Sequence, residues 1–233
     1  MIGFITLGRT LGWCWCWPKG KLRKEYDLEL FLSKRLPIFW VMGPPGCGKT
    51  TIALLLAECS HFSLISIGQL IKDEMFKGKE RSKFIEGKIS KEGVCPIDVL
   101  INLLKEKLFE TYQDSTGYIL DGFPLNLEQA RLFQFEICKV HIIIYPTLSL
   151  DALMVRIGTT KYAKEEFEHI KRVFLERSRL CQEVYRNYEQ KTLKFATVTP
   201  PDILLDKLIL DLNCYFGYKF NTPSNIKVTQ REN

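Results

Sequence analysis

Gly43-Pro44-Pro45-Gly46-Cys47-Gly48-Lys49-Thr50 is the stretch that decides the fold of this 233-residue chain. It satisfies every fixed position of G-x-x-x-x-G-K-[ST], the pattern of a phosphate-binding loop. An apolar, β-favouring run, 38–42, precedes the loop, and a helix-forming run, 51–58, follows it. Such a loop requires this order of strand, loop and helix, because glycines let backbone N–H groups and the helix N-terminus point at an anion. We therefore predict that the loop binds a nucleoside triphosphate.

The residues of the loop have separate predicted roles. Lys49 is expected to reach the β- and γ-phosphates, and the Thr50 hydroxyl is expected to bind Mg²⁺. Asp121 ends a predicted strand, so its carboxylate is expected close to the loop, where it would hold Mg²⁺ directly or through a water. The alternative for Asp121 is a turn or capping residue before Gly122. The residues predicted to bind ATP are Gly43, Pro44, Pro45, Gly46, Cys47, Gly48, Lys49, Thr50 and Thr51.

The overall composition is that of an average globular protein. Hydrophobic residues make up 46% of the chain and charged residues 26%, and no apolar run approaches the length of a membrane-spanning helix. The net charge of +6 is spread among interspersed acidic and basic residues, which argues against an extended nucleic-acid surface. A bound polyphosphate would use part of this positive charge.

The eight cysteines show neither paired metal-ligand spacing nor the density of a secreted disulfide scaffold. We interpret them as reduced thiols and predict a cytoplasmic location. Cys47 lies inside the phosphate loop and has two interpretations. It is either a small residue tolerated in a tight turn, or a thiol whose pKa the helix N-terminus lowers, so that its oxidation would block nucleotide binding.

Residues 1–35 precede the predicted nucleotide-binding core. This N-terminal extension is largely apolar up to residue 17, contains Trp13, Trp15 and Trp17, and then becomes basic over 19–24. One interpretation is a loosely ordered extension or a segment that docks on a partner. The other is an interfacial membrane anchor, with the tryptophans at the headgroups and a nearby cysteine acylated.

Strand and helix patterns alternate along the rest of the chain. Predicted strands lie at 38–42, 62–66, 117–121, 140–145 and 193–198. Strands that alternate with helices at this spacing predict an α/β fold with an open, parallel, doubly wound sheet and right-handed crossovers. Ligands bind at the carboxyl ends of the strands in such sheets, so the loops after residues 42, 66 and 121 are expected to meet in one crevice.

The turn Asp121-Gly122-Phe123-Pro124, taken with the phosphate loop, resembles the adenylate kinase family of nucleoside monophosphate kinases. Further similarity lies in 65–70, 80–83 and 93–96 and in Gln129. The resemblance implies a P-loop domain over 36–213 with a five-stranded parallel sheet. It also implies a helical acceptor-binding insertion at about 67–96, a short lid at about 158–163, and a C-terminal tail over 214–233. Members of this family convert a triphosphate and a monophosphate into two diphosphates, and we expect this chain to be a monomer.

Residue roles follow from the same resemblance. It assigns catalysis to Lys49, Asp121 and Arg156, and metal binding to Thr50 and Asp121. The residues that it assigns to the acceptor monophosphate are Lys72, Val94, Gly122, Gln129 and Arg172. Lys72 stands where the family has an arginine, so it keeps the charge but loses the bidentate fork.

Several positions depart from the family pattern, which makes this chain a divergent member with a shortened lid. Leu125 replaces the arginine of D-G-[FY]-P-R, and Ile67 replaces a threonine that contacts the acceptor. The lid has no arginine between Arg156 and Arg172, and Val173 occupies the position of a further catalytic arginine. Four cations would partly substitute if the lid folds over the site: Lys161, Lys164, Arg172 and Arg177.

Two functions remain open on the sequence. The first is Mg²⁺-dependent transfer of a phosphoryl group from ATP to a nucleoside monophosphate, AMP by family default, at a weak rate because donors to the phosphates are missing. The second is a nucleotide-binding module that has lost most of this chemistry and acts by docking on a protein. An unrelated P-loop ATPase is disfavoured, because D-G-F-P at this distance is not its signature.

Overall fold

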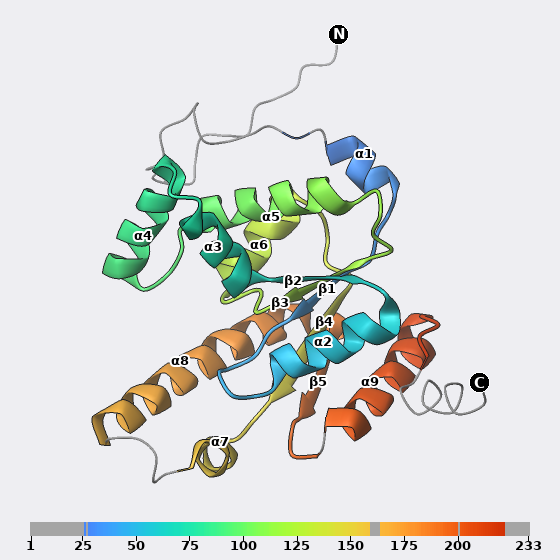
Figure 1. Ribbon diagram of the computed structural model, residues 1–233. Helices are drawn as coiled ribbons and strands as arrows, with labels where there is room; N and C mark the ends of the chain where they lie inside the picture. The colour runs from blue at the N-terminus through green and yellow to red at the C-terminus, as the bar shows by residue number, and fades with distance from the viewer. Residues whose placement is uncertain (1–25, 27, 159–163, 200, 222–233) are drawn as a thin grey trace, which may run out of the picture.

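A computed structural model describes residue 26 and residues 28–158, 164–199 and 201–221 (Figure 1). Five parallel strands form one sheet in the order β2-β3-β1-β4-β5. The strands are β1 (Ile38–Val41), β2 (Ser63–Ser66), β3 (Tyr118–Asp121), β4 (Ile142–Thr147) and β5 (Thr192–Ala196). The predicted α/β class, the parallel sheet and its five strands are confirmed.

Helices connect the strands and cover the sheet on both faces. They are α1 (Leu28–Ser33), α2 (Lys49–Ser60), α3 (Ile67–Phe76), α4 (Glu80–Glu92), α5 (Ile97–Thr111), α6 (Leu127–Glu136), α7 (Leu150–Ile157), α8 (Lys164–Tyr188) and α9 (Pro201–Phe216). A short 3₁₀ turn, Glu189–Lys191, joins α8 to β5. The helices α3 and α4 form an arm between β2 and α5 (Figure 1).

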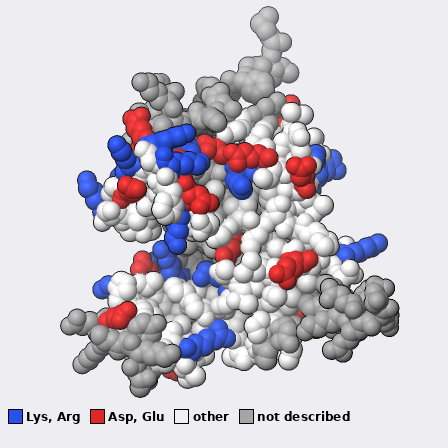
Figure 2. All heavy atoms as spheres, in the orientation of Figure 1, with Lys and Arg blue, Asp and Glu red and all other residues white. Residues whose placement is uncertain are grey.

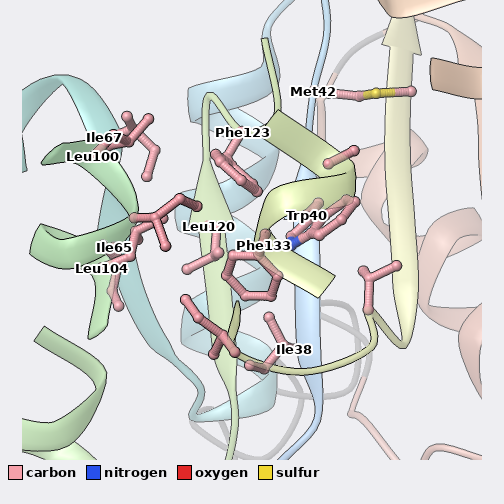
Figure 3. Packing of buried hydrophobic residues seen from close by; sticks show 14 of the residues in the cluster. Ile38, Trp40, Met42, Ile65, Ile67, Leu100, Leu104, Leu120, Phe123 and Phe133 are labelled. Carbon is pink, nitrogen blue, oxygen red and sulfur yellow. The ribbon is translucent and has the colours of Figure 1, made fainter. Parts of the chain in front are cut away.

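The central strand β1 shows why the core has two layers. Successive side chains of a strand point to opposite faces, so Ile38 and Trp40 join the layer under α5, α6 and α8, whereas Phe39 and Val41 join the layer under α2 and α9. All four are fully buried. The Trp40 ring meets Phe123 and Phe133 edge to face, with 5.3 Å between ring centroids in each pair (Figure 3). This packing fixes the turn after β3 against the strand that leads into the phosphate loop.

The two ends of the described chain also pack on the core. Phe31 of α1 is buried among aromatic rings of α5 and β3, and the Lys34 ammonium group donates to the backbone oxygens of Tyr112 and Gln113. Beyond α9, Tyr218 and Phe220 pack against Phe39. Thus the last residues of the predicted N-terminal extension and the first residues of the predicted tail both contribute apolar contacts.

The predictions for the tryptophan-rich segment before residue 26 and for lid residues 159–163 lie outside the described residues. Within the part of the chain that the structure describes, every helix is too short or too polar to cross a membrane.

Candidate functional site

The phosphate loop links β1 to α2, at the carboxyl end of the central strand. Its backbone needs glycine at particular points: Gly46 and Gly48 have φ angles of 74° and 83°. A Cβ on Gly43 would lie 2.7 Å from the Cys47 sulfur and 2.9 Å from the Pro146 carbonyl oxygen. The helix begins at Lys49, and its N-cap residue, Gly48, has no side chain that could accept a hydrogen bond from the first turn. The N–H groups of its first turn are therefore available to an anion.

Thr50 and Asp121 come together beside this loop. The Thr50 hydroxyl donates to Asp121 Oδ2 over 2.9 Å. Asp121 is only 5% exposed, and its second carboxylate oxygen, Oδ1, has no hydrogen-bond partner in the described part of the chain. Burial raises the pKa of Asp121, although the Thr50 hydrogen bond and the Lys49 charge act to lower it. A buried carboxylate oxygen next to a hydroxyl is a donor set that Mg²⁺ prefers, so these two residues fit the metal that the sequence predicts.

Two cationic side chains lie against the loop. The Lys49 ammonium nitrogen is 3.4 Å from the Pro44 carbonyl oxygen, a long contact that leaves most of its hydrogen-bonding capacity unused. Arg156, in the last turn of α7, donates from Nη1 to the Gly46 carbonyl oxygen over 2.9 Å and from Nη2 to the Thr197 carbonyl oxygen. The structure therefore brings Arg156 to the loop from 110 residues away in the sequence.

Gln129 lies beside the D-G-F-P turn, in the first turn of α6. Its backbone N–H donates to the side-chain oxygen of Asn126, which caps the helix, and its own Oε1 accepts from the Leu125 N–H, each over 2.9 Å. The Gln129 side chain is buried. Its position is thus fixed by the turn that it follows, and its amide nitrogen is the group that could donate to a base. Gly122 begins the same turn with a φ angle of 82°.

The remaining residues predicted for the acceptor come from separate elements. Lys72 is exposed on α3, Val94 is 40% exposed after α4, and Arg172 is exposed on α8, where its guanidinium lies 3.1 Å from His169 Nδ1. Within the described ranges no hydrogen bond or ion pair joins Lys72 or Arg172 to the phosphate loop. Figure 2 shows a hollow between α3 and α4 on one side and α7 and α8 on the other, with Lys and Arg side chains around it. The roles assigned to these three residues stay predictions.

Two sequence departures have visible structural effects on the acceptor side. Ile67, at the start of α3, is buried in the core cluster with Trp40 and Phe123 and so cannot supply a polar contact. Leu125 is half-buried and engages Gln129 through its backbone alone. Both positions therefore lack a side chain that donates to phosphate.

One interpretation of Cys47 is wrong. The thiol is fully buried, and burial raises its pKa above the ordinary cysteine value, although Lys49 and nearby backbone N–H groups act to lower it. A buried thiol with a raised pKa is a poor nucleophile, so the structure supports a small residue packed under the loop.

Sequence reasoning missed Thr197 as a neighbour of the site. Its side chain is buried, its N–H donates to the Thr147 carbonyl oxygen over 2.9 Å, and its own carbonyl oxygen holds Arg156. The available signal was its place near the carboxyl end of the fifth predicted strand, 193–198, because the carboxyl ends of parallel strands meet at one edge of the sheet.

Comparisons with known proteins agree with this geometry. A family model described as adenylate kinase matches residues 41–194. Adenylate kinase 1 of Drosophila melanogaster is 24% identical over 205 residues, which cover 85% of this chain and 90% of that protein. Adenylate kinase 1 of Schistosoma mansoni is 28% identical over 194 residues, 81% of this chain and 98% of that protein. Adenylate kinase isoenzyme 5 of Mus musculus is 32% identical over 124 residues, 53% of this chain and 22% of that protein.

Proposed function

This chain belongs to the adenylate kinase family, and from that premise we propose that it transfers the γ-phosphoryl group of ATP to a nucleoside monophosphate in a Mg²⁺-dependent reaction. The observation that carries the proposal is the pair Thr50 and Asp121 beside the open N-terminus of α2. Asp121 Oδ1, which has no hydrogen-bond partner among the described residues, and the Lys49 ammonium group, which makes one long contact, are the groups that would bind the metal and the triphosphate. A loop that served only as a turn would have no need of these groups.

The residues around the loop supply binding and orientation. The N–H groups of the loop and of the first turn of α2 would hold the β- and γ-phosphates, and Lys49 and Arg156 would add positive charge. Thr50 and Asp121 would hold Mg²⁺, which when bound neutralises charge on the phosphate oxygens. Phosphoryl transfer needs little covalent help from the protein, so this positioning accounts for most of the expected catalysis.

We propose AMP as the acceptor, with Gln129 donating to its base from a position fixed by Leu125 and Asn126. We also propose that the reaction is slow. Ile67 and Leu125 supply no phosphate contact, and each missing donor commonly lowers the rate by about 10²–10³-fold. The cytoplasmic location, the monomeric state and the residue roles assigned from the sequence stay part of the proposal.

A coupled assay of Mg²⁺ATP against AMP, CMP, UMP and dAMP tests this function. We expect measurable turnover with AMP and a loss of at least about 10³-fold in Lys49→Ala, because Lys49 is a main cation at the transferred phosphate. Lys207→Ala, which removes an exposed lysine of α9, is the matched control and should leave the rate unchanged. Turnover that survived Lys49→Ala would come from a contaminating kinase, and wild-type turnover no higher than that background would refute the assignment.

A second candidate is a nucleotide-binding module that acts by docking, and the burial of Ile67 in the core favours it. Calorimetry separates the two. Association of both ATP and AMP supports the kinase, association of ATP with an empty acceptor site supports the module, and no association of ATP or ADP at millimolar concentration refutes both.

A further inference from the structure

Among the described residues, Arg81 of α4 and Arg177 of α8 are the partly buried arginines, and they differ in how their charge is paired. Arg81 donates to two carboxylates, those of Glu74 and Glu106, over 2.6–2.9 Å. Arg177 is half-buried, yet it forms no hydrogen bond or ion pair within the described ranges. Partial burial of a guanidinium that has no anion beside it is unfavourable. Arg177 is therefore a side chain that would gain from a bound anion.

The position of Arg177 along α8 places it beside the phosphate loop. Cys181, four residues later, is only 3% exposed, and its thiol accepts a hydrogen bond from the Gly43 backbone N–H. Burial raises the pKa of this thiol to about 11, with the buried Cys47 thiol adding to the rise, while the charges of Lys49 and Arg177 act to lower it. Cys181 thus contacts the loop, and Arg177 lies on the same helix face one turn away.

The direction of α8 decides which side of the loop Arg177 occupies. The helix starts at Lys164, after the lid segment, and runs back past the loop to the sheet (Figure 1). Arg177 precedes Cys181, so it lies one turn from the contact with the loop, towards the start of α8 at Lys164. The hollow in Figure 2 lies between α3–α4 and α7–α8. A triphosphate held by the loop would extend its γ-phosphate from the N-terminus of α2 towards the acceptor in this hollow.

We propose that Arg177 is a catalytic residue whose guanidinium binds the phosphoryl group in transfer between donor and acceptor. This inference rests on the proposed function. In the step, an oxygen of the acceptor phosphate forms a new bond to the γ-phosphorus as the bond to the β–γ bridging oxygen breaks, and ADP leaves with that electron pair. Charge on the equatorial oxygens of the γ-phosphoryl group is what a planar guanidinium fork stabilises.

Steady-state kinetics of Arg177→Ala, Arg177→Lys and the control Arg179→Ala test the proposal. Arg179 is exposed on the same helix, two residues on and therefore on a different face. We expect kcat/KM to fall about 10²-fold or more in Arg177→Ala, since it removes one donor to the transition state. Arg177→Lys should fall less, because it keeps the charge but loses the fork. Arg179→Ala should match the wild type.

Ligand affinity separates the failure of this proposal from the failure of the proposed function. By calorimetry, Arg177→Ala should lose at least about tenfold in affinity for two adenosines joined by five phosphates, which span donor and acceptor, and less than about threefold for ATP. If the wild type binds this analogue but does not turn over, the proposed reaction fails, and the catalytic role of Arg177 fails with it. Unchanged affinity for the analogue in the folded variant would overturn the inference, as would a wild type that does not bind it.

A second-site rescue excludes a merely structural role. Val173 lies one turn nearer the lid on the same face of α8, so an arginine there can reach the same phosphate. Val173→Arg introduced into Arg177→Ala should recover at least about tenfold in kcat/KM, because it restores one charge-assisted contact. A structural defect would show no such recovery. Circular dichroism checks folding, and if Arg177→Ala does not fold, the same measurements on Arg177→Lys decide the question.

Discussion

The phosphate-loop region differs from the helical arm α3–α4, together with the helix α5 on which the arm packs, in whether its charged groups are paired. Beside the loop, Asp121 Oδ1 has no partner among the described residues, Lys49 makes one long contact, and Arg177 is unpaired within the same ranges. In the arm, Glu74 is 2% exposed and accepts from both Lys77 and Arg81, and Arg81 also binds Glu106. The charged groups of the first region are available to a ligand, whereas those of the second form ion pairs with one another.

This difference fits the proposed function, in which the donor site at the phosphate loop is more complete than the acceptor site. The arm is held by contacts between α3, α4 and α5, with Lys105 and Glu136 joined over 2.5 Å between α5 and α6. Its stability therefore does not depend on a bound monophosphate. The loop region, by contrast, holds unpaired polar groups at the expense of stability, which is the usual arrangement of a functional site.

The largest expected effect is on the stability of the arm. Arg81→Ala removes the cation shared by two carboxylates and leaves Glu74 buried with only Lys77. Breaking a buried ion pair by removing one partner typically lowers the free energy of unfolding by about 3–5 kcal/mol. Urea unfolding at pH 7 measures this loss. Lys83→Ala, an exposed lysine on the same helix, is the control and should change stability little.

The pH dependence of stability tests the same ion pairs of Glu74. Burial acts to raise the pKa of Glu74, but the hydrogen bonds from Arg81 and Lys77 lower it below the ordinary value. This stabilisation is present above the pKa of the unfolded carboxyl and is lost as the pH falls through the lower pKa of the folded protein. The difference in free energy of unfolding between the wild type and Arg81→Ala should therefore become smaller in acid. A loss below about 1 kcal/mol at pH 7 would show that the arm is not held by its charges.

The second effect is a gain of activity on the acceptor side. Leu125→Arg supplies a phosphate donor at the turn where the family has one, while its backbone N–H can still donate to Gln129. We expect kcat/KM with AMP to rise about tenfold to a hundredfold, somewhat less than a preorganised donor is worth, because the surrounding contacts are not adapted to it. Leu125→Met is the control that keeps the site apolar. An unchanged kcat/KM would show that a feature other than the missing arginine at position 125 limits the reaction with AMP.

The centre of the sheet was predictable because β1, β3 and β4 are buried on both faces and are rich in apolar residues. All five predicted strands are present, and each end lies within two residues of its predicted position. The fourth begins at Ile142 instead of 140, because His141 lies in the approach, where its N–H donates to the Ile38 carbonyl oxygen and its Nδ1 accepts from the Ile38 N–H. Such side-chain contacts across 103 residues are not visible in a local pattern.

The site was predictable where it depends on strand ends and less so where it depends on helix faces. Asp121 meets Thr50 because Asp121 ends β3 and Thr50 follows the loop after the neighbouring strand β1, an arrangement that the alternation of elements already implied. In α8 the helical period shows which residues share a face, but only the packing shows that the face of Cys181 and Arg177 meets the loop. The ion pairs of Arg81 likewise needed the arrangement of α3, α4 and α5.

The smallest effect tests whether the loop region really holds its charge at the expense of stability. Burial raises the pKa of Asp121, although Thr50 and Lys49 act to lower it, so above the pKa of the unfolded carboxyl the ionised group destabilises the fold. Asp121→Asn removes the charge and can still accept from Thr50. We expect the metal-free variant to be about 1 kcal/mol more stable at pH 7, with the gain disappearing below the unfolded pKa. Mg²⁺ with ATP should then stabilise the wild type more than the variant.

Asp114→Asn, which changes an exposed aspartate, is the control for the loss of one acidic charge. A variant no more stable than the wild type would show that the ionised Asp121 carboxylate does not destabilise the protein when no ligand is bound. The contrast between the phosphate loop and the arm would then not hold for Asp121.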